Sequence, residues 1–308
     1  MPTRARRCTR SLLSVLMLVH LLAATVPVLA QEGSPHEAGV VVGTPELTIR
    51  ACPDSSCATL GLAPLEDPIT VTGPAENGFL PVDWQGTVGW AWYLYVATPA
   101  AGTPFLQRGT PGCNRVAIIV NIGIGEPLQL DPLLWLQAEG VPATLFPMGW
   151  WAQAFPDDMG TLAMLGFPIG SHGDVPLDLT GFTDEELVMT VQDSYAHIRQ
   201  ITGQEPIPYF TPYAANMDER VRNIIARLGY LPVFWDVPAD DWVAGTTPEQ
   251  VYGNVVPNVV DGSIIEFHLD APSSAESTAV ALPGIVAELR ERGFQFVTIP
   301  EMAQPCAW

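Results

Sequence analysis

Histidine and carboxylate side chains follow several apolar segments in the later part of the chain. His172 lies in SHGDVPLDLT, and Asp174 comes two residues after it. Asp241 stands beside Trp242 in FWDVPADDWV, and His268 lies in IIEFHLD. An aspartate with a histidine has the residue types for general acid catalysis near neutral pH. The alternative is that Asp241 and His268 form only a buried hydrogen-bonded pair that positions two strands.

The segment RVAIIVNIGIGEP, residues 115–127, raises a second question about chemistry. An apolar run leads into Gly-x-Gly and then into Glu126 and a proline. This could be a phosphate-binding loop, a plain strand end, or a catalytic loop that has lost its carboxylates. The nucleotide-binding interpretation is weak because the third glycine and an immediately following helix are missing.

Residues 115–300 alternate short apolar runs with amphipathic segments such as TDEELVMTVQDSYAHIRQITG. This alternation predicts parallel strands with helices outside, as an open sheet or a barrel. In such folds the site lies at the carboxyl ends of the strands. The histidines and carboxylates above all fall at such positions.

Residues 38–97 instead show short alternating runs separated by glycine and proline, which predict a small β-barrel. An LTIRACPDSSCATL hairpin and a W-x-G-x-V-G-W segment from Trp84 to Trp90 resemble the bacterial SH3 domain. The resemblance implies binding of cell-wall peptides or glycans. The alternative is a structural spacer whose tryptophans fill a small core. Residues 98–112, rich in proline, glycine, alanine and threonine, predict a linker.

The N-terminus resembles a secretory leader. Four arginines, at positions 4, 6, 7 and 10, precede the apolar SLLSVLMLVHLLAATVPVL, and VLA ends at residue 30. We therefore predict a signal peptide over residues 1–30 and a secreted or cell-envelope location. An uncleaved membrane anchor is the alternative, and it would be the chain's only membrane contact.

The net charge of the chain indicates which classes of ligand it can bind. The formal charge is −20, and without the four leader arginines nine arginines face 33 acids, which gives −24; the sequence contains no lysine. Nucleic acid is therefore excluded as an expected partner. A glycan ligand is expected to be neutral or cationic.

Four cysteines follow the leader. Because their number is even in a chain expected to be exported, they predict two disulfides. Of the three possible pairings we favour Cys52 with Cys57, and Cys113 with Cys306, which would join the two ends of the second domain. A metal site is the weaker alternative, because no histidine lies near these cysteines in sequence.

Residues 115–300 resemble the polysaccharide deacetylase (NodB-homology, carbohydrate esterase) family. The resemblance rests on segments in matching order: GVPATLFPMGWWA, IGSHG, DLTGFTDEEL, PYFTPY, RVRNIIARLGY, VFWDVPADDW, GSIIEFHL and GFQFVTI. It implies an α/β fold, a distorted (β/α) barrel over residues 113–306, preceded by the small all-β SH3-like barrel. It also implies removal of acetyl groups from N-acetylated sugars with a divalent metal such as zinc.

Three family motifs are altered. In the T-F-D-D-G motif, alignment puts Gly123 at the base and Ile124 at a metal ligand. In the His-x-x-x-His motif, His172 is kept but Pro176 takes the second position. In the R-P-P-Y-G motif, Thr211 replaces the arginine. His172 remains as a residual metal ligand, with Asp174 and Glu126 as weak candidates.

Two motifs are kept. By resemblance His268 is the acid for the leaving amine, Asp241 tunes it, and Trp242 lines an apolar groove. Tyr213 is an aromatic platform for sugar or a core residue. The two remaining histidines of the mature chain, His36 and His197, are expected to be solvated and to offer no replacement for the lost groups.

Three functional hypotheses follow. The preferred one is a glycan-binding protein of the cell wall that has lost metal-dependent turnover and needs no cofactor. The second is an active hydrolase of N-acetyl amide bonds in carbohydrate, working with His172, Asp174, Asp241 and His268, with or without zinc. The third is a structural scaffold.

Overall fold

A computed structural model describes residues 36–306, so the predicted leader at residues 1–30 lies outside the described residues. The first seven strands form one antiparallel sheet in the order β3-β2-β6-β5-β4-β1-β7. They are β1 (Glu37–Val41), β2 (Glu46–Arg50), β3 (Thr59–Pro64), β4 (Pro68–Val71), β5 (Phe79–Trp84), β6 (Thr87–Trp92) and β7 (Val96–Ala97), with a 3-10 turn η1 (Tyr93–Tyr95) before β7.

The predicted hairpin is present as β2 and β3. The Cys52–Cys57 disulfide closes the loop between them, with the two Cα atoms 5.7 Å apart. Alternate residues of the strands, among them Leu47, Ile49 and Val82, point into a common core because successive side chains of a strand face opposite sides.

The later strands pair in parallel. β8 lies between β13 on one side and β14 and β9 on the other, β12 extends the sheet beyond β13, and β10 pairs with β11. Isolated parallel bridges join Leu145 to Ile169 and Ser171 to Phe210, which links β9 to β10. The strands are β8 (Arg115–Ile122), β9 (Thr144–Pro147), β10 (Tyr209–Phe210), β11 (Leu231–Pro232), β12 (Val237–Pro238), β13 (Ile264–His268) and β14 (Gln295–Val297).

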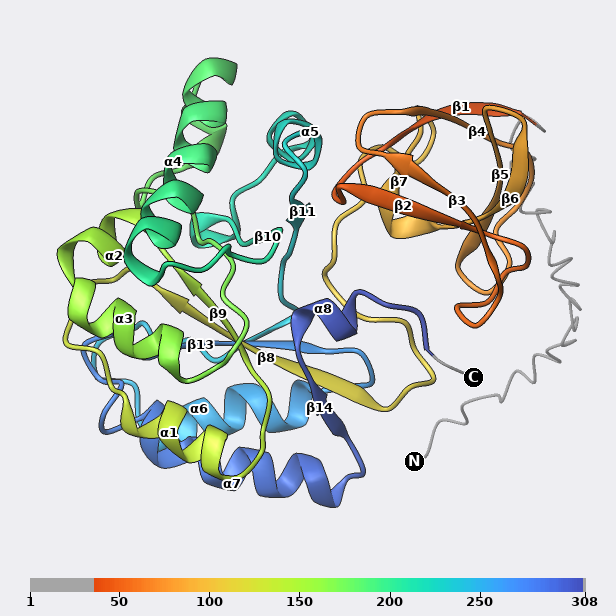
Figure 1. Cartoon of the computed structure of the whole chain (residues 1–308). Helices are drawn as coiled ribbons and strands as arrows, with labels where there is room; N and C mark the ends of the chain where they lie inside the picture. Colours follow the sequence, from red (N-terminus) through yellow and green to blue (C-terminus); the bar gives the residue numbers. More distant parts are fainter. Residues whose placement is uncertain (1–35, 307–308) are drawn as a thin grey trace, which may run out of the picture. The chain divides into compact units, whose positions relative to one another are not determined.

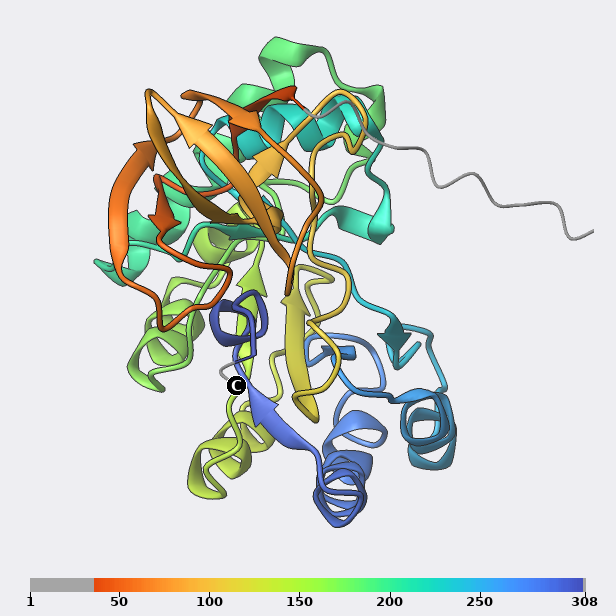
Figure 2. The ribbon, with the colours of Figure 1, turned by 90° about the vertical axis from the view of Figure 1, so that its right-hand side faces the viewer.

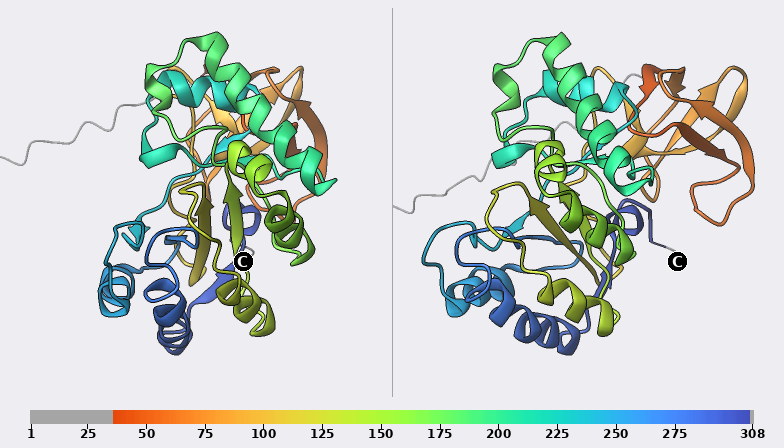
Figure 3. Two further views of the ribbon diagram at one scale, coloured as in Figure 1. Left: turned by 90° about the vertical axis from the view of Figure 1, so that its left-hand side faces the viewer. Right: turned by 60° about the vertical axis from the view of Figure 1, so that its left-hand side comes forward.

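Helices cover the outside of these strands, which makes the second part an α/β structure (Figure 1). α1, α6 and α7 lie together on one side of β8 and β13, while α2, α3 and α4 form a second group (Figures 1 and 3). The helices are α1 (Asp131–Ala138), α2 (Gly149–Ala154), α3 (Pro156–Met164), α4 (Asp184–Thr202), α5 (Glu219–Arg227), α6 (Pro248–Val255), α7 (Thr278–Glu291) and α8 (Ile299–Met302); shorter 3-10 turns are η2 (Leu179–Gly181), η3 (Tyr213–Ala215) and η4 (Val256–Asn258).

β8 is buried on both faces, which explains its unbroken apolar sequence. Val116 to Val120 and Ile122 are at most 1% exposed. A parallel strand covered by helices shows such a continuous run instead of alternation. Asn121 is the exception, a fully buried polar side chain one residue before the strand ends.

The antiparallel sheet packs against the parallel part (Figure 2). Phe79 and Trp92 belong to the same hydrophobic cluster as Ile119 and Phe146, and the Trp92 indole N–H donates to the carbonyl of Ala303 at 2.9 Å. The predicted Cys113–Cys306 disulfide is confirmed and joins the start of the parallel part to its end. Over residues 36–306, no helix combines the length and apolar character needed to cross a membrane.

Candidate functional site

A cavity of about 360 Å³ opens at the carboxyl ends of β8, β12 and β13. This is the edge at which the parallel pattern predicts a site. Its wall contains two histidines, two carboxylates and three large aromatic residues, together with polar and apolar side chains. The lining residues are Asn121, Gly123, Ile124, Met148, His172, Tyr213, Ala214, Ala215, Trp235, Pro238, Asp240, Trp242, Glu266 and His268.

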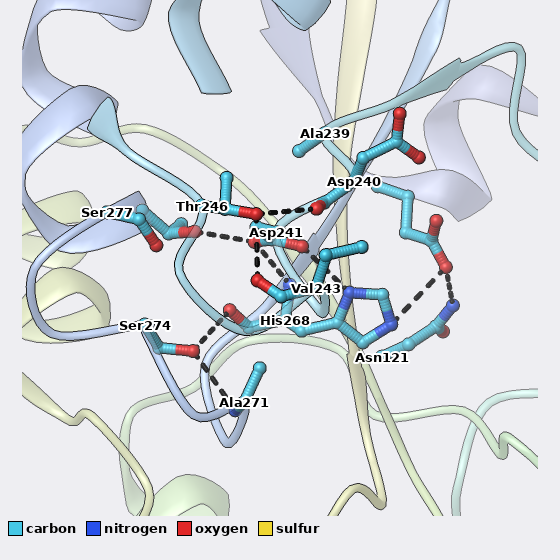
Figure 4. A network of polar contacts seen from close by, with 12 residues as sticks. Asn121, Ala239, Asp240, Asp241, Val243, Thr246, His268, Ala271, Ser274 and Ser277 are labelled. Carbon is cyan, nitrogen blue, oxygen red and sulfur yellow. Dashed lines mark hydrogen bonds and ion pairs between the residues drawn. The ribbon is translucent and has the colours of Figure 1, made fainter. Parts of the chain in front are cut away.

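The predicted pair of Asp241 and His268 is in contact. His268 Nδ1 lies 2.9 Å from Asp241 Oδ1, and the His268 backbone N–H donates to Oδ2 of the same carboxylate at 2.9 Å (Figure 4). The Thr278 hydroxyl donates to Oδ2 as well. Asp241 is fully buried, so its carboxylate is held on three sides and fixes the imidazole ring.

Burial by itself lowers the pKa of His268, because it disfavours the charged ring. The Asp241 hydrogen bond, together with the negative charges of Glu266, Asp241 and Asp270, outweighs burial and raises the pKa to about 9. The imidazole is therefore protonated at neutral pH, and it can donate from Nε2 toward the cavity.

A line of hydrogen bonds crosses the cavity floor from His172 to Glu266. His172 Nδ1 lies 2.9 Å from the Thr211 hydroxyl, the Thr211 hydroxyl donates to Asn121 Oδ1 at 2.9 Å, and Asn121 Nδ2 donates to Glu266 Oε1 at 2.7 Å. Because the single Thr211 proton is used on Asn121, His172 must donate from Nδ1. Every bond in the line therefore runs toward Glu266.

Glu266 is the end point of this line and lies on β13, two residues before His268. Only 5% of it is exposed, and Oε1 lies 3.6 Å from His268 Nε2. Burial raises the pKa of Glu266 to about 7, against the opposing effects of the His268 charge and the Asn121 hydrogen bond. Burial, reinforced by the nearby His268 charge, lowers the pKa of His172 to about 3 and keeps that ring neutral.

The glycine-rich segment after β8 wraps around a different carboxylate. Asp270, which follows β13, accepts hydrogen bonds from the backbone N–H groups of Gly123 at 3.0 Å and Gly125 at 2.9 Å. A Cβ atom at Gly123 would approach the Met148 side chain to 2.6 Å, and Gly125 has a φ of +100°. The segment is thus a strand end held by a buried aspartate.

The remaining candidate metal ligands do not converge on His172. Asp174 Oδ1 bonds Nδ1 of His197 on α4 at 2.8 Å, and Glu126 is exposed outside the cavity lining. Pro176 is also exposed. His36 is exposed as expected, and His197 is partly exposed, with 25% of its side chain accessible and Nδ1 bonded to Asp174.

The divalent metal that the family resemblance implies is not matched by the residues present. Within residues 36–306, no three histidine, cysteine, aspartate or glutamate side chains are grouped so that they could hold a metal ion. At the end of β8 the side chains near the cavity are an amide at Asn121 and an alkyl group at Ile124. Neither is a typical ligand for zinc.

Aromatic side chains form the outer part of the cavity. Trp242 is 56% exposed and Tyr213 is 38% exposed, and the Tyr213 ring centroid lies 6.3 Å from that of His172. Trp235 lies deeper and packs against the cluster shared by the two parts of the chain. The rim thus offers flat apolar faces above a polar floor.

Sequence reasoning missed two residues of the floor. It placed the altered base position at Gly123, whereas the polar side chain that reaches the cavity from β8 is Asn121, which bonds the Thr211 that replaces the motif arginine. It also passed over Glu266. The available signal was a carboxylate in the otherwise apolar strand IIEFH, since a fully buried charge is rare unless it has a role or a partner.

The strand order and the position of the cavity define an α/β protein with its site at the carboxyl ends of parallel strands. A family profile described as polysaccharide deacetylase matches residues 109–233. A peptidoglycan-N-acetylglucosamine deacetylase of Bacillus cereus is 30% identical over 178 residues, which cover 57% of this chain and 80% of that protein. The chain therefore belongs to the polysaccharide deacetylase family.

Two further proteins are similar to this chain, one in sequence and one in fold. A chitooligosaccharide deacetylase of Azorhizobium caulinodans is 26% identical over 200 residues, covering 61% of this chain and 94% of that protein. The crystal structure of a CE4 family pseudoenzyme from Bacillus anthracis has a TM-score of 0.59 and 21% identity, covering 65% of this chain and 68% of that one. At this identity the structural likeness shows the fold.

Proposed function

We propose that this protein is an exported, cell-envelope-associated glycan-binding protein that has lost metal-dependent turnover. The observation that carries the proposal is the composition of the cavity. The aromatic rim and the Asp241–His268 pair are present, whereas Gly123, Ile124, Pro176 and Thr211 stand where the family motifs have groups that bind or support a metal-activated water. Without such a water, amide hydrolysis lacks a strong nucleophile.

The partner class follows from the relatives. They are named for peptidoglycan and chitooligosaccharide substrates, so a cell-wall polysaccharide is the expected ligand. The Bacillus anthracis pseudoenzyme of similar fold supports the proposal that a member of this family can lack turnover. We also propose that the antiparallel sheet at residues 37–97 is an SH3-like module that adds wall binding.

One observation favours a second function, hydrolysis at a divergent site. Glu266 and His268 face the same cavity with Oε1 and Nε2 3.6 Å apart, and their pKa values are about 7 and about 9. A carboxylate and an imidazolium poised in this way can act as general base and general acid. Asp174, which the sequence-based hypothesis included, has no place in this arrangement, because it bonds His197.

Acetate release separates the two functions. Purified protein is incubated with N-acetylglucosamine oligomers at pH 7, with added zinc and with a chelator. The binding function predicts no release above background in either condition. Release stimulated by zinc and abolished by His172→Ala would contradict the loss of metal-dependent turnover. Release that is independent of zinc and lost in Glu266→Gln would support the divergent hydrolase.

A further inference from the structure

We propose that the cavity selects a sugar unit with a free, protonated amine over its N-acetylated counterpart, and that Glu266 is the anionic partner of that amine. The inference rests on the proposed glycan-binding function and specifies the ligand of the same cavity. It starts from the hydrogen-bond arrangement of Glu266, which leaves one carboxylate oxygen open.

Both contacts of the Glu266 carboxylate use the same oxygen. Oε1 accepts from Asn121 Nδ2 at 2.7 Å and faces His268 Nε2 at 3.6 Å. Oε2 has no protein partner among the described residues, and it is not among the side-chain atoms there that are sealed from solvent without a partner. Because the side chain lines the cavity, Oε2 is available to a ligand.

The positive charge nearest to Glu266 is that of the His268 imidazolium, which already forms an ion pair with Asp241. His268 is bound through Nδ1 to Asp241 Oδ1 at 2.9 Å, so the imidazolium and that aspartate neutralise each other (Figure 4). The other histidine of the floor, His172, is neutral. The His268 imidazolium also faces Glu266 Oε1 at 3.6 Å, so one positive charge is shared between two carboxylates and Glu266 is not fully balanced. A buried carboxylate in this condition is stabilised by a cation that enters the cavity.

The surroundings add to this preference. The described residues that line the cavity include Asp240 at the rim but no arginine. The sequence contains no lysine. Trp242 and Tyr213 offer ring faces that attract a cation through their π electrons. The formal charge of −20 raises the local concentration of cationic ligands around the protein. An acetamide group carries no positive charge and so cannot form an ion pair with Glu266.

Calorimetric titrations with two tetrasaccharides of equal length test the proposal: one of glucosamine and one of N-acetylglucosamine, at pH 7 and low salt with the full mature chain. We expect the glucosamine tetramer to bind at least tenfold more tightly. In Glu266→Gln, which keeps the side-chain shape, the preference should fall to less than threefold. Glu185→Gln, an exposed carboxylate in the first turn of α4 and outside the cavity lining, is the matched control and should retain the preference.

Each possible result of these titrations contradicts a different claim. Equal binding of the two tetramers by the wild-type chain, or tighter binding of the N-acetylated one, overturns the selection of a free amine while the glycan-binding function stands. A preference that survives unchanged in a folded Glu266→Gln variant overturns the role of Glu266. Failure of both tetramers, and of peptidoglycan fragments, to bind the wild-type chain contradicts the glycan-binding function itself.

Discussion

Asn121 and Glu266 meet side chain to side chain across two neighbouring parallel strands, with Nδ2 of Asn121 donating to Oε1 of Glu266 at 2.7 Å. Asn121 also accepts from the Thr211 hydroxyl at 2.9 Å. The amide thus uses its donor and its acceptor in opposite directions. An aspartate at this position could keep the bond with Thr211 but would turn a second carboxylate toward Glu266.

We therefore predict that Asn121→Asp destabilises the protein, and more at pH 8 than at pH 5. At pH 8 two carboxylates would face each other without a donor, at a cost of about 1–3 kcal/mol in the free energy of unfolding. At pH 5 one of them can be protonated and donate to the other. Urea unfolding at both pH values measures the effect.

A double variant provides the control. Asn121→Asp combined with Glu266→Gln exchanges the amide and the carboxylate, so the introduced glutamine can donate from its side-chain amide to the introduced carboxylate. The double variant should be more stable than Asn121→Asp at pH 8. An additive loss of stability in the double variant would show that the bond between the two side chains does not govern the effect.

The pKa of His268 predicts a second pH dependence. Its folded-state pKa of about 9 lies above the ordinary value of 6.5. The stabilisation from this shift is therefore fully present below pH 6.5 and is lost as the pH rises through 9. The loss should be on the order of 3 kcal/mol.

Unfolding measurements between pH 6.5 and 9.5 test this dependence, and NMR titration of the His268 ring checks the pKa directly. Asp241→Asn should lower the pKa of His268 by more than one unit and flatten the decline in stability. A wild-type ring that titrates near 6.5 would refute the assignment of an imidazolium to the cavity.

The Cys113–Cys306 disulfide should stabilise the fold more than the Cys52–Cys57 disulfide. The first spans 193 residues and the second spans five. Restriction of the unfolded chain gives about 5 kcal/mol for the long loop and about 2 kcal/mol for the short one. Paired cysteine-to-serine variants, compared by urea unfolding, measure the difference. Equal losses would contradict the loop-length argument.

The fold could be predicted where the sequence pattern is local. The apolar run of β8 and the alternation of runs with amphipathic helices indicated an α/β structure with parallel strands, which the pairing of β8 with β13 confirms. The pairings of both disulfides were also predictable, because the cysteines flank a hairpin loop in one case and the parallel part in the other.

The site was predictable only in part, because its contacts depend on tertiary packing. Asp241 comes shortly after β12 and His268 is the last residue of β13, two strands that end at one edge of the sheet, and the two side chains are in contact as expected. Asp174 follows a strand in the same way, but α4 brings His197 against it and removes it from the cavity. The contact of Asn121 with Glu266 required the register of β8 and β13, which no sequence pattern specified.

Calorimetric titration of a cell-wall oligosaccharide into the wild-type chain and into Trp242→Ala tests glycan binding in the cavity most directly. Since Trp242 is an exposed aromatic on the rim, its removal should weaken binding by more than about 1 kcal/mol, the usual mark of a hot spot. Tyr252→Ala is the control, because Tyr252 is an aromatic on α6 that is 38% exposed and outside the cavity lining. It should bind as the wild type does. Equal binding by wild type and a folded Trp242→Ala variant, or no binding by the wild type, would contradict a glycan site in this cavity.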